Sequence, residues 1–149
     1  MVLVAVLFAL GFMKIIKDLR RRDWGGQPSI PELALANSEL TLPPETRNEE
    51  YSAFSRLTFM AAIVRADSPL AIEEVADHFK NLAVILKWTP KIDRVKGVDR
   101  KMVFCSGRLS RVIEIIPSKD GARIRAGTYW ESEKNNENYC PPSRDVRVR

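Results

Sequence analysis

An uninterrupted apolar segment at the start of the chain constrains its fold more than any other feature of the sequence. Residues 1–13 carry no charge. Five basic residues follow within nine positions, namely Lys14, Lys17, Arg20, Arg21 and Arg22. A helix over this segment would be apolar on every side, and such a helix requires either lipid or a large core. Sixteen residues, to Ile16, rise by roughly 24 Å, somewhat less than a hydrocarbon layer of about 30 Å, which lysine side chains can extend.

We therefore predict a membrane anchor with a basic flank at residues 1–22, and we place Trp24 at the membrane interface. Basic clusters stay on the cytoplasmic side of a membrane, so the body of the protein is expected there. The alternatives are a buried or partner-packed helix and an export signal, although a signal has its basic residues before the apolar run. An exported or periplasmic domain could carry a Cys105–Cys140 disulfide, whereas a cytoplasmic one would keep two thiols.

The middle of the sequence predicts a linker followed by one small domain. Residues 23–50 are rich in proline and glycine and show no sustained period, which indicates an extended linker with at most one helical turn near residues 31–36. Residues 51–131 are predicted to fold, and residues 132–149 to form an irregular tail.

The folded part is predicted to be α+β. A strand is expected over residues 54–67 and an amphipathic helix over residues 69–86, starting at Ser68 and Pro69. Three further strands are expected at residues 102–107, 109–117 and 122–130, with a tight turn at Asp120-Gly121. The expected fold is a two-layer domain in which the helix covers one face of a four-stranded sheet.

Composition and motifs argue against catalysis. The two cysteines and the single histidine cannot supply the four ligands of a usual zinc site, and no phosphate-binding loop or nucleophile elbow is present. His78 and Asp77 are adjacent on the predicted helix and so point in different directions. We predict a protein without catalytic residues, metal or cofactor.

The sequence leaves a binding or structural role. We predict a membrane-anchored accessory or structural subunit that contacts other subunits, or a second copy of itself, through the anchor and the uncovered sheet. The alternative is a module that binds single-stranded nucleic acid or anionic lipid, because the net charge is +5 and basic residues gather in the loop 91–101 and on the last strand. The possible anion contacts are Lys91, Arg94, Lys96, Arg100, Lys101, Arg123 and Arg125.

Overall fold

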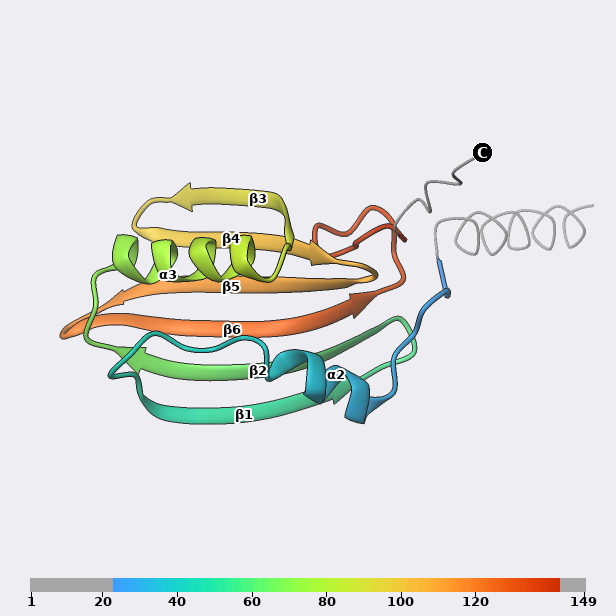
Figure 1. Ribbon diagram of the computed structural model, residues 1–149, viewed down its shortest axis with the longest axis horizontal. Helices are drawn as coiled ribbons and strands as arrows, with labels where there is room; N and C mark the ends of the chain where they lie inside the picture. The colour runs from blue at the N-terminus through green and yellow to red at the C-terminus, as the bar shows by residue number, and fades with distance from the viewer. Residues whose placement is uncertain (1–22, 143–149) are drawn as a thin grey trace, which may run out of the picture.

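A six-stranded antiparallel sheet forms most of the structure, a computed structural model that describes residues 23–142 (Figure 1). The elements in chain order are α2 (Ile30–Asn37), β1 (Arg47–Ser55), β2 (Phe59–Ser68), α3 (Ile72–Ile85), β3 (Thr89–Lys96), β4 (Asp99–Ser106), β5 (Leu109–Ser118) and β6 (Gly121–Glu131). The strand order across the sheet is β1-β2-β6-β5-β4-β3. The two outermost strands are therefore β1 and β3.

Both helices lie on the same face of the sheet. Figure 1 shows α3 in front of β4 and β5, and α2 in front of β1 and β2. The hairpin β1–β2 leads into α3, and the meander β3–β6 then brings β6 back beside β2. The turn between β5 and β6 requires glycine, because Gly121 has a φ of +138° and a Cβ there would collide with the Ser68 carbonyl.

Two apolar clusters fill the space between the helices and the sheet. The larger cluster joins the apolar side of α3, with Val75, Phe79 and Ala83, to buried residues of β4, β5 and β6. The smaller cluster surrounds Leu33 of α2 and includes Trp130, and both side chains are fully buried. Each helix thus covers its own part of the sheet.

A buried arginine lies between the two clusters. The side chain of Arg111 on β5 is 2% exposed, and its guanidinium donates to Thr128 Oγ1 at 2.5 Å and to Glu39 Oε2 at 2.7 Å. The guanidinium also stacks on the Trp88 ring, 5.1 Å from its centroid. Asn37 Oδ1 accepts a hydrogen bond from the Thr128 backbone N–H at 3.0 Å. This network fixes the end of α2 and the start of the connector 38–46 to the middle of the sheet.

The predicted fold class, a linker followed by a two-layer domain with a four-stranded sheet, is wrong. The sheet has six strands, and the two helices of the described residues are short and not apolar throughout. Residues 47–55 and 89–96 form the edge strands β1 and β3, whose exposed and largely polar side chains concealed them. The segment expected to be a linker contains α2 and the start of β1.

The strand predicted over residues 54–67 is wrong at its start, because it runs across the turn between β1 and β2, but the remaining predicted elements lie close to where they were expected. The helix, predicted from residue 69, begins at Ile72 instead, because Ser68 Oγ accepts from the Leu70 N–H and stabilises a turn before it. The Glu74 carboxylate caps the helix by accepting from the Ala71 N–H at 2.9 Å. The three predicted C-terminal strands are confirmed as β4, β5 and β6.

The prediction of a single-pass transmembrane helix is contradicted for the described part of the chain. Neither helix between residues 23 and 142 is long and apolar enough to cross a bilayer. The predicted anchor, residues 1–22, lies outside the described residues.

The buried arginine network yields a prediction about stability. The substitution Arg111→Ala should lower the free energy of unfolding by about 3 kcal/mol, because it leaves a cavity and removes a partner of the buried Thr128 hydroxyl. Arg111→Met should lose much less, because methionine restores most of the volume. Urea unfolding measures both, with Arg65→Ala on the exposed sheet surface as the control. Equal stability of Arg111→Ala and the control would contradict this role.

Candidate functional site

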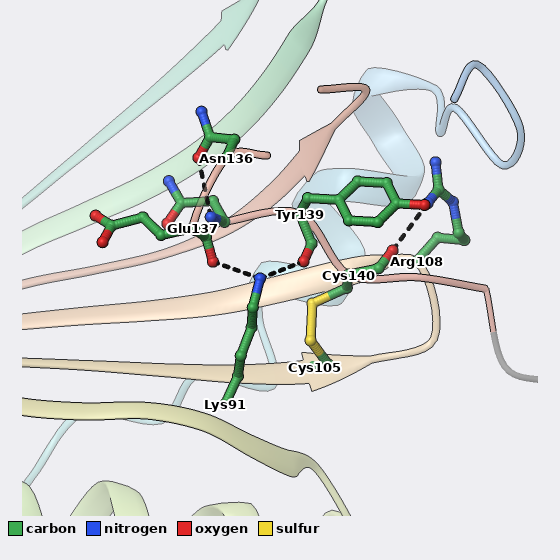
Figure 2. The surroundings of a disulfide bond; sticks show 8 residues. Lys91, Cys105, Arg108, Asn136, Glu137, Tyr139 and Cys140 are labelled. Carbon is green, nitrogen blue, oxygen red and sulfur yellow. Dashed lines mark hydrogen bonds between the residues drawn. A yellow bond between two sulfur atoms is a disulfide. The ribbon is translucent and has the colours of Figure 1, made fainter. Parts of the chain in front are cut away.

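The structure does not bring the seven predicted anion contacts together. Lys91, Arg94 and Lys101 surround the C-terminal segment, residues 132–142, on the sheet face opposite the helices. Lys91 Nζ donates to the carbonyls of Glu137 at 2.7 Å and Tyr139 at 2.5 Å (Figure 2). Burial lowers the pKa of Lys91. Arg94 lies 3.2 Å from the Glu137 carboxylate, which also accepts from Lys101.

The remaining basic residues are distributed over the molecule. Arg100 lies on the helix-covered face, where it pairs with Glu73 and with Asp93 at 2.7 Å. On the opposite face, Arg123 pairs with Asp67 at 3.4 Å and Arg125 with Glu114 at 2.9 Å. Of the seven side chains, that of Lys96 alone makes no hydrogen bond or ion pair in the described structure. Most of this positive charge is therefore neutralised within the protein.

Most of the predicted membrane-interface residues cannot be placed in the structure. Lys14, Lys17, Arg20, Arg21 and Arg22 lie outside the described residues. Trp24, the sixth predicted interface residue, is 38% exposed and lies next to the segment that Arg108 holds.

A disulfide fastens the C-terminal segment to the sheet. Cys105 of β4 bonds to Cys140, with 5.6 Å between the Cα atoms (Figure 2). Arg108, in the turn between β4 and β5, donates to the Cys140 carbonyl at 2.8 Å and stacks on Tyr139, 5.0 Å from the ring centroid. It also donates to the Asp23 carbonyl at 3.1 Å. One arginine thus connects both ends of the described chain.

The disulfide also corrects the predicted localisation. Disulfides persist in oxidising compartments and are rare in the cytosol. The prediction that the body of the protein lies in the cytoplasm is therefore contradicted by the Cys105–Cys140 bond. Of the two localisations that the sequence suggested, only the exported or periplasmic alternative is compatible with it.

Asp23 reinforces this junction. Its carboxylate accepts hydrogen bonds from the Gly25 backbone N–H at 3.0 Å and from the Tyr139 hydroxyl at 2.9 Å, and it lies 3.3 Å from Arg108. These contacts, the Gly25 hydrogen bond first, lower the pKa of Asp23 below its ordinary value.

Removing the disulfide should destabilise the protein. The bond closes a loop with a sequence separation of 35 residues. Because an open loop of this length gains chain entropy on unfolding, the double variant Cys105→Ser, Cys140→Ser should lose about 3–4 kcal/mol of unfolding free energy. Urea unfolding of the wild type with and without a thiol reductant provides the matched comparison. An unchanged midpoint in both the variant and the reduced wild type would contradict the structural role of the bond.

The Glu137 carboxyl group should titrate at low pH. Its pKa lies below the ordinary value of 4.5, chiefly because Lys101 donates a hydrogen bond to it. A lowered pKa means that the carboxylate contributes stability above pH 4.5 and loses it as the pH falls through the folded-state pKa. A carboxyl-detected NMR titration should give a midpoint below 4.5, and Lys101→Met should raise it. A midpoint at or above 4.5 in the wild type would show that the contact does not form.

The single histidine of the described residues makes a structural contact. His78 Nε2 lies 2.8 Å from the Thr41 carbonyl, so the histidine helps to hold the connector 38–46 against α3. Between residues 23 and 142, no three His, Cys, Asp or Glu side chains are placed to share a metal ion.

A groove with a volume of about 840 Å³ lies between the connector 38–46 and the hairpin β1–β2. We call it the β1 groove. Its floor consists of side chains that point to the helix-covered face, from Tyr51 and Ala53 of β1 and from Ala62 and Val64 of β2. Its far wall is formed by the connector residues 40–43, and its volume is in the range typical of ligand sites.

The charged rim of the β1 groove is acidic. Glu45 and Glu49 line it, and no lysine or arginine among residues 23–142 does. Tyr51 is 69% exposed, and its hydroxyl donates to the Glu49 carboxylate at 2.5 Å. This hydrogen bond is the main cause of the raised pKa of Tyr51. A carboxylate beside an accessible aromatic ring is suited to a cationic group.

The groove runs beside an open sheet edge. β1 pairs with β2 on one side only, so its other side presents N–H and C=O groups without strand partners in the described sheet. Sequence reasoning missed this site, because it placed residues 23–50 in a linker. The alternation of residues 50–54 between the two faces was the available signal, and it is too short to identify a strand by itself.

Comparisons with protein-family models, with curated proteins and with solved structures give no significant match for this chain.

Proposed function

We propose that this protein is a non-catalytic accessory or structural subunit that binds an extended segment of a partner protein along β1. The observation that supports the proposal most is the combination of the open β1 edge with the β1 groove beside it. In strand addition, main-chain hydrogen bonds supply affinity, and pockets for alternate side chains supply specificity. Both elements are present at β1.

The other edge of the sheet is less suited to this role. β3 contains Pro90, which lacks an N–H, and basic residues such as Arg94 and Lys96. Proline and lysine are residues that natural proteins use to protect exposed edges. β1 contains neither, although a bulge between Arg47 and Glu50 interrupts its pairing at one end. The regular stretch available to a partner is residues 50–55.

The nucleic-acid and anionic-lipid alternative has less support. It requires free positive charge, and six of the seven basic residues on which it was based contact protein acceptors. The alternative stays a prediction. A protein that is not retained on a heparin column at low salt would count against it.

The proposal is tested by selecting peptides from a random library with the full chain and mapping where they bind. Hydrogen exchange should show new protection of backbone amides in β1, since their outward-facing groups gain partners when a strand is added. Residues 89–96 of β3 provide the internal control and should exchange as in the free protein. Selected peptides that protect β3, or no segment of the sheet, would contradict the proposal.

A further inference from the structure

We infer that the segment bound along β1 is cationic, with basic side chains at alternate positions facing the β1 groove. This inference rests on the proposed function and adds the chemistry of the partner. It follows from the charges around the groove, from the Tyr51–Glu49 pair and from the repeat of side chains along one face of the edge strand β1.

The acidic residues on the rim of the β1 groove differ from four other acidic residues of the described chain. Asp67, Asp93, Glu114 and Glu137 each lie within ion-pair distance of an arginine or lysine. In contrast, Glu45 and Glu49, the two acidic residues that line the groove, form no ion pair in the part of the chain that the structure describes. Their negative charge is available to a partner, and complementary charge favours both the rate and the specificity of association.

Glu49 and Tyr51 define where a basic side chain would lie. Both belong to β1 and line the groove, and the Tyr51 hydroxyl is bound to Glu49. A guanidinium or ammonium group beside them can pair with the carboxylate and contact the face of the ring. Glu45 lies on the same rim and can receive a second basic group.

The edge explains why the partner is extended. Side chains on one face of a strand recur about every 6.6 Å, and only another extended backbone can match the hydrogen-bonding groups of β1 along its length. Ala53 and Ala62 form adjacent parts of the floor, and their small side chains leave room for the alkyl stems of arginine or lysine. A small cation would use the acidic rim without using the edge.

The experiment uses the full chain and a labelled synthetic peptide in which arginine and valine alternate. Fluorescence anisotropy should detect binding that weakens with salt, and a peptide with glutamate in place of arginine should not bind. The double variant Glu45→Gln, Glu49→Gln should bind the arginine peptide about tenfold more weakly. The matched control is Glu133→Gln, an exposed acid outside the groove, which should bind as the wild type does.

Two further measurements separate strand addition from simple charge attraction. Peptides that carry N-methyl groups on either set of alternate amides are made, and at least one of them should lose binding, because it cannot complete the hydrogen bonds to β1. Hydrogen exchange with the unmethylated peptide should protect residues 50–55.

The outcomes distinguish the inference from the proposed function. If arginine and glutamate peptides protect β1 equally, the cationic chemistry is wrong and the proposed function stands. If no peptide protects β1, both are wrong. Full binding by both N-methylated peptides would overturn the inference, since binding would then be ionic only. A stable dimer through β1 that the arginine peptide does not dissociate would overturn it as well.

Discussion

The buried guanidinium of Arg111 is the contact on which the arrangement of the other elements depends. From β5 it donates hydrogen bonds to Thr128 on β6 and to Glu39, which follows α2 in the chain. It also lies over the ring of Trp88, which follows α3. Burial lowers the pKa of Arg111, and the Glu39 carboxylate opposes that effect. Because a buried charge is costly without a partner, the connector must pass close enough to supply Glu39. That position of the connector also creates the far wall of the β1 groove.

The opposite face of the sheet is organised by a different set of contacts. The Cys105–Cys140 disulfide and the cations around Glu137 hold residues 132–142 against β3 and β4. Arg108 extends this junction to Asp23. Basic side chains of β3 and β4 therefore contact the C-terminal segment. The carboxylates near the start of β1, in contrast, form no ion pair in the described structure. This uneven use of charge favours a basic partner at β1 over an anionic one at β3.

The sequence predicted those elements whose side chains are sorted by burial. The apolar side of α3 and the apolar residues of β5 and β6 were visible, because each of these elements is largely buried on at least one face. The strands β1 and β3 were missed, because each has a single half-buried residue, and backbone pairing leaves no mark in the sequence. The Arg111–Glu39 pair spans 72 positions, and arginine is read as a surface residue when its partner is unknown. The β1 groove was missed together with the strand that forms it.

The central claim is that β1 accepts a seventh strand whose basic side chain lies against Glu49 and Tyr51. The most direct measurement is the crystal structure of the full chain bound to an alternating arginine–valine peptide. The account predicts an extended peptide hydrogen-bonded to residues 50–55, with a guanidinium within salt-bridge distance of Glu49 and the strand order of the free sheet unchanged. A peptide bound beside β3, or one in contact with acidic side chains but not with the β1 backbone, would contradict it.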